Sequence, residues 1–144
     1  MALPYRHTQP GVVMLTGLLI GAAAAGYAAL INPAATRWIV LPIALGLIAL
    51  AWLFSSLTVI VNGDELRWYF GPGAWNYRIS LRDIAAVRIV RNSAFSGFGI
   101  RMRPGFRLYN VSGLNAVEVR LKSGEIRRIG TDDPNGLSAA LQTS

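Results

Sequence analysis

Residues 11–57 read GVVMLTGLLIGAAAAGYAALI (Gly11–Ile31), NPAATR (Asn32–Arg37) and WIVLPIALGLIALAWLFSSL (Trp38–Leu57), and this stretch decides the fold. Both long runs are apolar and uncharged, and Arg37 is the one charge between them. About 20 such residues cross the roughly 30 Å hydrocarbon core of a bilayer as a helix. The pattern predicts a transmembrane helical hairpin over residues 11–57, with spans at 11–31 and 38–57.

Two rival interpretations of these runs are weaker. A cleaved secretory signal would suit the first run, because Arg6 precedes it and Ala22–Ala25 offers small residues for cleavage. However, the run is longer than the apolar segment of about 7–15 residues that a signal usually carries. A buried hairpin of a soluble protein would suit both runs, but the rest of the chain is too short to bury two such helices. We therefore expect both runs to lie in a membrane.

Basic residues predict how the hairpin is oriented. Residues 58–144 hold twelve of the fourteen basic residues together with all seven acids, whereas Arg37 stands alone in the loop between the spans. Basic segments next to a span stay on the cytoplasmic side. We therefore expect a protein that crosses the cell (inner) membrane twice with both termini in the cytoplasm. Residues 1–10, which include Arg6 and His7, are expected to be a disordered or interfacial tail.

A small-residue face runs along the first span. Gly17, Gly21 and Ala25 recur every four residues, and a G-x-x-x-G pattern lets another backbone approach closely. The face predicts packing of one span on the other within the hairpin, or association with a second copy or another membrane protein. The pattern alone leaves these alternatives open.

Beyond Ser56 the continuous apolar pattern gives way to alternation, which is typical of β-strands. Asn62-Gly63 is a strong signal for a two-residue hairpin turn. The rows of apolar side chains in residues 65–70 and 75–79 are expected to face one core. Short antiparallel strands are predicted at residues 57–61, 65–70, 75–79, 84–90, 100–102, 106–111 and 117–121.

The end of the chain predicts one further strand and a helix. Residues 125–129 do not alternate cleanly, so a strand there needs a bulge near Arg127 or Arg128. Asp133 as N-cap and Pro134 at the first helical position predict a C-terminal amphipathic helix. Such a short helix must dock on the sheet, because it would not persist alone.

About seven short antiparallel strands followed by one capping helix are the plan of a pleckstrin-homology-like (PH-like) barrel, so residues 58–144 are expected to form this domain. Three stretches carry a more specific resemblance: Tyr109–Gly113, Ala116–Glu118, and Ile129–Pro134 with Leu137. In them the chain resembles small bacterial two-span membrane proteins with a C-terminal PH-like domain. The resemblance implies a fold and a location rather than a reaction.

Residue types that carry catalysis or bind metals are scarce in this chain. It has no cysteine and one histidine, His7, so disulfides and thiolate metal sites are excluded. Asp132 and Asp133 are explained by a helix start, and Asp64 and Glu65 by a turn, which leaves no base, nucleophile or ligand cluster. The uncharged spans also disfavour a transport pathway. We expect no enzyme activity, no cofactor and no metal.

The net charge of +7 favours an anionic partner, although a GC-rich genome would also enrich arginine. A membrane anchor argues against nucleic acid. The short acidic turn Asn62–Glu65 lacks the basic residues with which PH domains read phosphoinositides. Phe95 and Phe98 in a glycine-rich loop predict either contact with the membrane interface or a small apolar cluster under the loop. Five arginines are candidate contacts for anionic lipid or a partner, or form a solvated basic face: Arg88, Arg91, Arg101, Arg103 and Arg107.

These observations predict a non-catalytic, membrane-anchored protein whose cytoplasmic domain is an interaction or scaffold module. Its expected partners are the lipid bilayer and another membrane-associated protein or a second copy. The alternative function is sensing or binding of anionic lipid head groups by the basic face. Because the hairpin already localises the domain, lipid contacts would orient it rather than recruit it.

Overall fold

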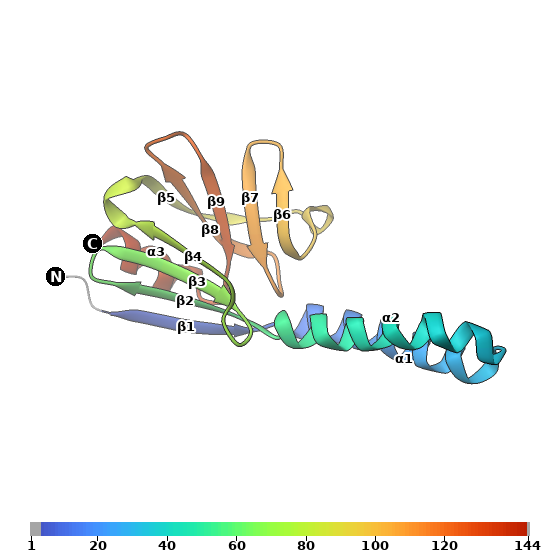
Figure 1. The fold of residues 1–144 in the computed structure, drawn as a ribbon. Coiled ribbons are helices and arrows are strands. Elements are labelled where there is room, and N and C mark those ends of the chain that lie inside the picture. The colour runs from blue at the N-terminus through green and yellow to red at the C-terminus, as the bar shows by residue number, and fades with distance from the viewer. Residues whose placement is uncertain (1–3, 144) are drawn as a thin grey trace.

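The computed structural model describes residues 4–143. Two apolar helices, α1 (Val12–Ile31) and α2 (Ala34–Leu53), form a hairpin that projects from a domain of nine strands and a C-terminal helix, α3 (Pro134–Gln142) (Figure 1). Both ends of the described chain lie at the domain end, away from the tip of the hairpin (Figure 1). The predicted order of helical hairpin, β-rich domain and terminal helix is confirmed.

The strands form two sheets that share one hydrophobic core. The four-stranded sheet has the order β1-β2-β3-β4, with every pair antiparallel. Its strands are β1 (Tyr5–Pro10), β2 (Ser56–Asn62), β3 (Glu65–Phe70) and β4 (Ala74–Ser80). The five-stranded sheet has the order β5-β8-β9-β7-β6. Its strands are β5 (Ile84–Arg91), β6 (Gly99–Arg103), β7 (Phe106–Asn110), β8 (Asn115–Leu121) and β9 (Ile126–Gly130).

Two short 3₁₀ turns complete the domain. The turn η1 (Leu81–Asp83) joins the two sheets, and η2 (Ala94–Ser96) lies in the loop before β6. The architecture differs from the prediction in strand number, because nine strands in two sheets replace about seven in one barrel. It also differs in direction, because β7 and β9 pair in parallel.

The polar tail predicted at residues 1–10 is, over Tyr5–Pro10, the edge strand β1, which pairs antiparallel with β2. Residues 1–3 lie outside the described part of the chain, as does Ser144. The residues Arg6–Gln9 of β1 are all polar, so the strand carries no alternation of apolar and polar residues that would predict it. Proline at the end of an edge strand is tolerated, because no ladder hydrogen bond needs its missing N–H. The β domain therefore contains chain from both sides of the hairpin.

The two long helices touch along small side chains. Ala22 and Ala29 of α1 and Ala44 and Ala51 of α2 are buried, each pair seven residues apart. Large apolar side chains point outward instead, and Trp38 is 83% exposed. An apolar surface this extensive is rare on a monomeric protein in water and marks a membrane or protein contact. Both helices are long and apolar enough to cross a membrane, which supports membrane association.

The second helix begins and ends about one turn earlier than the predicted span Trp38–Leu57. Ala34 and its neighbours are good helix formers without an apolar period, so the helix starts directly after Asn32-Pro33. Arg37, predicted in the loop, lies in the first turn of α2, where its Nε donates to the Ala29 carbonyl at 2.8 Å. That carbonyl belongs to the last turn of α1, whose oxygens lack helical donors.

The predicted row of inward side chains on β3 is confirmed, since Leu66, Trp68 and Phe70 are at most 1% exposed. In the second row, on β4, Tyr77 and Ile79 pack against the core. Trp75 is 42% exposed and meets the core residue Phe70 edge-on, with ring centroids 6.4 Å apart. The antiparallel pairing of β2 with β3 around Asn62-Gly63 is also as predicted.

Strand β9 is confirmed, but without the predicted bulge near Arg127 or Arg128, because its register with β8 is unbroken. Ile129 faces the core and Ile126 the outer face. Arg127 therefore shares the core face, and its Nη1 donates to the Tyr109 hydroxyl at 2.7 Å. An inward arginine satisfied by hydrogen bonds accounts for the irregular pattern.

Helix α3 begins as predicted. The Asp133 side chain accepts from the Gly136 N–H at 3.1 Å, as an N-cap should, and Pro134 is the first helical residue. Leu137 and Leu141 are buried in the core shared by the two sheets. The helix contacts β1, β5 and β8, so it covers one side of the space between the sheets.

Candidate functional site

The hairpin joins the β domain through two connections that have almost no linker. One residue, Gly11, separates β1 from α1, and Phe54 and Ser55 separate α2 from β2. The Gly11 N–H donates to the Ser55 carbonyl at 2.8 Å, so the two connections are hydrogen-bonded to each other. A Cβ on Gly11 would overlap the Phe54 carbonyl oxygen, so this crossing requires glycine. Figure 1 shows β1 and β2 running on into the helices.

The turn between β3 and β4 is a third contact with the end of α2. Gly71 has φ of +48° and donates its N–H to the Ser56 carbonyl at 2.9 Å. A Cβ there would lie 2.5 Å from the Leu53 carbonyl oxygen and 2.8 Å from that of Trp52. Glycine is therefore required both by backbone conformation and by space.

An aromatic cluster fills the corner where the hairpin meets the sheets. Phe54 stacks on Trp75 with ring centroids 4.8 Å apart and meets Phe70 edge-on at 5.1 Å. A Cβ on Gly99, the first residue of β6, would lie 3.7 Å from the Phe54 ring and 3.8 Å from Met14 of α1. We call Met14, Phe54, Phe70, Trp75 and Gly99 the hairpin base.

Trp75 is the one described non-glycine residue with a positive φ, at +47°. A bulky side chain in this region is strained and persists only where its surroundings hold it. Trp75 is 42% exposed beside the end of α2, where its ring stacks on Phe54. This suits tryptophan, which concentrates at membrane–water interfaces. The sequence pattern placed Trp75 in the core row and missed its exposure.

Strand β6 is the edge of the five-stranded sheet on the side toward which the hairpin projects (Figure 1). The preceding loop, which contains η2, points in the same direction (Figure 1). Phe95 in this loop is 90% exposed and Met102 on β6 is 77% exposed, whereas Phe98 is half-buried. We call residues 93–103 the hairpin-side edge.

The five candidate arginines do not form one cluster. Paired residues of neighbouring strands point to the same face of a sheet. Three of the five lie on the outer face of the five-stranded sheet, because Arg88 pairs with Glu118, Arg101 with Leu108 and Arg103 with Phe106. Arg91 and Arg107 point to the opposite face, because each lies an odd number of residues from a residue on the outer face. Of the five, only Arg101 and Arg103 belong to the hairpin-side edge.

Arg101 and Arg103 hold the loop of this edge in place. Arg101 Nε donates to the Phe98 carbonyl at 2.9 Å, and the Arg103 guanidinium donates to the Phe95 carbonyl. Neither has an ion-pair partner among residues 4–143. Each guanidinium has five N–H donors, so most remain available.

Arg88, by contrast, is used within the protein. Its Nε donates to Glu118 at 2.7 Å, and Arg128 Nε donates to the other Glu118 oxygen at 2.7 Å. The Glu118 side chain is only 4% exposed. Burial raises the pKa of this carboxyl, but the hydrogen bonds from Arg88 and Arg128 and their charges together outweigh burial, so the pKa lies below its ordinary value.

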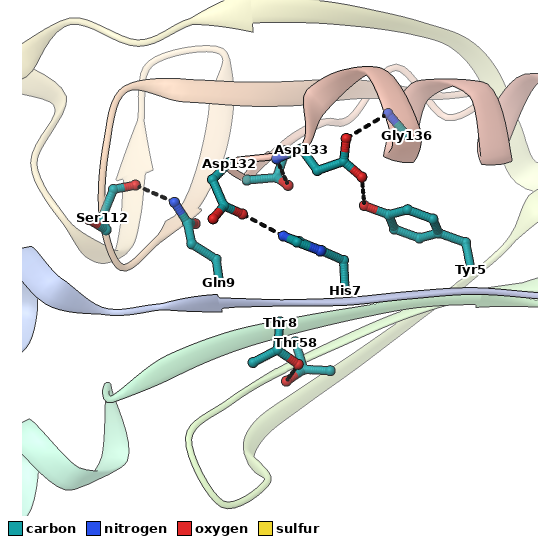
Figure 2. Close-up of polar contacts among 10 residues, drawn as sticks. Tyr5, His7, Thr8, Gln9, Thr58, Ser112, Asp132, Asp133 and Gly136 are labelled. Atoms are coloured by element: carbon teal, nitrogen blue, oxygen red, sulfur yellow. Dashed lines mark hydrogen bonds and ion pairs between the residues drawn. The ribbon is translucent and has the colours of Figure 1, made fainter.

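A polar cluster fastens β1 to the segment before α3 (Figure 2). Tyr5 Oη donates to Asp133 Oδ2 at 3.0 Å, and His7 Nε2 lies 2.5 Å from Asp132 Oδ1. Further along β1, Gln9 donates to the carbonyl of the loop after β7 at 3.0 Å. Burial, followed by the hydrogen bond and charge of Asp133, raises the pKa of Tyr5 well above its ordinary value.

The pairing of His7 with Asp132 does not lead to a nucleophile. The Thr8 and Thr58 hydroxyls lie on the opposite side of β1 and bond to each other at 2.9 Å (Figure 2). Residues 4–143 also contain no group of three or more His, Cys, Asp or Glu side chains that could hold a metal ion. The cluster serves to attach the edge strand, and the lack of enzyme activity stays a prediction.

The small-residue face of α1 is divided between two environments. A Cβ on Gly21 would lie 3.4 Å from Leu47 of α2, so this position faces the hairpin partner. A Cβ on Gly17 would meet no atom within 4 Å. Ala25 is half-buried. Packing within the hairpin thus uses part of the face and leaves Gly17 open.

No protein-family model matches this chain, and no curated protein matches its sequence. What the structure supports is therefore a pair of membrane-compatible helices followed by a β-rich domain with a terminal helix.

Proposed function

We propose that this protein is a non-catalytic, membrane-anchored scaffold whose PH-like domain binds other membrane-associated proteins. The observation that carries the proposal is the junction at the hairpin base. Two linker-free connections and the Gly71 turn hold the domain in one orientation relative to the helices. A domain held in this way presents the same surface to every neighbour in the membrane plane, which is what a scaffold requires.

The PH-like assignment rests on the arrangement of the two sheets. They enclose a common core, and a C-terminal helix covers one side of the space between them. We place the domain in the cytoplasm and the hairpin in the cell (inner) membrane, because the domain carries most of the basic residues. A reporter fused after Ser144 tests this topology: activity only outside the cytoplasm would contradict it.

The outer face of the five-stranded sheet offers a surface for an acidic protein partner. A hollow of about 230 Å³ lies between β5 and β8 and is lined by Ala86, Arg88, Glu118 and Arg120. Arg120 is exposed and has no ion-pair partner among the described residues. Arginine recognises carboxylates through its planar fork of donors, so an acidic side chain suits this hollow.

Photo-crosslinking in native membranes tests the scaffold role. A photoreactive amino acid at Ala86 should capture a defined protein, whereas the same group at Asn76, exposed on the four-stranded sheet, should not. Arg120→Glu should abolish the adduct at Ala86 by charge repulsion. Adducts that are the same at both positions, or that persist in Arg120→Glu, would contradict the proposal.

A further inference from the structure

We propose that the hairpin-side edge docks on the membrane leaflet that the hairpin enters, with Phe95 in the lipid interface and Arg101 and Arg103 on anionic lipid head groups. The hairpin alone supplies the anchor. The edge would supply a second, lipid-specific contact that fixes the domain against the bilayer. The inference shares with the proposed function the premise that the hairpin crosses the membrane.

The position of the edge follows from the hairpin base. Gly99 packs beside Phe54 and Met14, where α2 ends and α1 begins. The Met14 N–H lies 3.3 Å from the carbonyl of Val111, the residue after β7, so the C-terminal end of β7 also touches the first turn of α1. Strand β6 therefore starts at the level where the two apolar helices join the domain, and the loop with η2 extends from there in the direction of the helices (Figure 1).

The chemistry of the edge fits a lipid interface. Phe95 is almost fully exposed, and its backbone carbonyl accepts a hydrogen bond from the Arg103 guanidinium. Aromatic and apolar side chains next to arginines are typical of surfaces that lie in the interface of a bilayer. Basic residues close to an anionic leaflet are attracted to its surface potential.

The leaflet is favoured over a protein as the occupant by continuity with the anchor. The two chain connections bring the bilayer to the edge whenever the protein is in a membrane, without any encounter. Arg101 and Arg103 have no acidic partner among residues 4–143, so their charge is available to head groups. A protein partner or a second copy would have to exclude lipid from this position first.

Site-specific spin labels test the docking in the full chain, because the sequence contains no cysteine to compete for the label. Single cysteines replace Ala94 in the loop, Leu45 on α2 and Ser123 in the exposed β8–β9 turn. The protein is reconstituted in nanodiscs of mixed phosphatidylglycerol and phosphatidylcholine. Labels at positions 94 and 45 should be relaxed more strongly by oxygen than by a water-soluble nickel chelate, and the label at position 123 should show the reverse.

Two comparisons then isolate the lipid contact. Phe95→Ser should shift the label at position 94 toward water, as should Arg101→Gln combined with Arg103→Gln. Arg107→Gln, which removes an exposed arginine from the other face of the sheet, should leave it unchanged. Replacing phosphatidylglycerol with phosphatidylcholine should act like the double arginine change.

The outcomes separate this proposal from the proposed function. A lipid-exposed label at position 45 with a water-exposed label at position 94 overturns the docking and leaves the anchor intact. Water exposure at both positions overturns the membrane-spanning hairpin itself. If neither reagent relaxes the label at position 94, protein covers the edge. If the label is exposed to lipid but does not shift in the double arginine variant, the arginines have no part in the contact. Both outcomes overturn the proposal.

Discussion

Gly71→Ala should loosen the attachment of the β domain to the hairpin, and Gly63→Ala provides its matched control. Both glycines lie in turns with positive φ, +48° and +59°, so alanine costs each a similar conformational penalty of about 1 kcal/mol. A Cβ at Gly63 meets nothing within 4 Å, whereas at Gly71 it would lie 2.5 Å from the Leu53 carbonyl oxygen. The pair therefore separates backbone strain from steric conflict.

The steric part is expected to be the larger. The conflicting atoms at Gly71 are backbone carbonyls of the last turn of α2, which cannot rotate away as a side chain could. Overpacking of this kind typically costs about 1–3 kcal/mol. Gly71→Ala should thus lower the free energy of unfolding by about 2–4 kcal/mol, against about 1 kcal/mol for Gly63→Ala.

Denaturant unfolding of the full chain in micelles measures the two losses, and amide hydrogen exchange locates them. In Gly71→Ala the Gly11 N–H, bonded to Ser55 across the junction, should exchange faster than in the wild type. In Gly63→Ala its exchange should be unchanged. Equal losses in the two variants, or an unchanged Gly11 amide in Gly71→Ala, would refute the idea that this turn fixes the domain.

Two further predictions concern the sheet network and the helix face. Glu118→Gln should lower the free energy of unfolding by about 2 kcal/mol, because it weakens buried charge-assisted hydrogen bonds, whereas Arg88→Gln, at an exposed arginine, should cost under about 1 kcal/mol. The pKa of Glu118 is lower in the folded than in the unfolded state, so its stabilisation is present above about pH 4.5 and is lost as the pH falls; unfolding of Glu118→Gln should depend less on acid pH. In micelles, Gly21→Leu should lower the thermal stability of the hairpin, because position 21 faces α2, whereas Gly17→Leu should leave it unchanged. A dimer that dissociates in Gly17→Leu would show that the open part of the face binds a second helix.

The elements that could be predicted from the sequence are those whose signal is local. The two apolar helices follow from run length, the β2–β3 hairpin from Asn62-Gly63, and α3 from Asp133 followed by Pro134. Each signal lies within the element that it specifies. Even so, the ends of α2 were misplaced by about a turn, because apolar character marks the membrane span rather than the limits of the helix.

The features that could not be predicted depend on contacts between distant parts of the chain. Strand β1 is held by Tyr5 and His7 to residues more than a hundred positions away, and its own pattern is polar. Arg127 points inward because Tyr109 supplies a hydroxyl from another strand. Trp75 leaves the core row because the register of β3 with β4 shifts at this position, and Phe54, outside its hairpin, stacks on it. The sequence pattern named Arg101 and Arg103 as candidates but could not separate them from Arg88, which forms an ion pair with Glu118.

The rigid junction changes how strong any second contact needs to be. A domain on a flexible tether samples many orientations, so each membrane or protein contact must offset the loss of that freedom. Here the junction fixes the orientation during folding, so in the docking that we propose the hairpin-side edge would meet the leaflet at a high effective concentration. In that docking, one exposed phenylalanine and two arginines without ion-pair partners among the described residues would suffice without a deep basic pocket. The short acidic turn at Asn62–Glu65 is consistent with this, because a protein anchored by its own helices has no need of that pocket to reach the membrane.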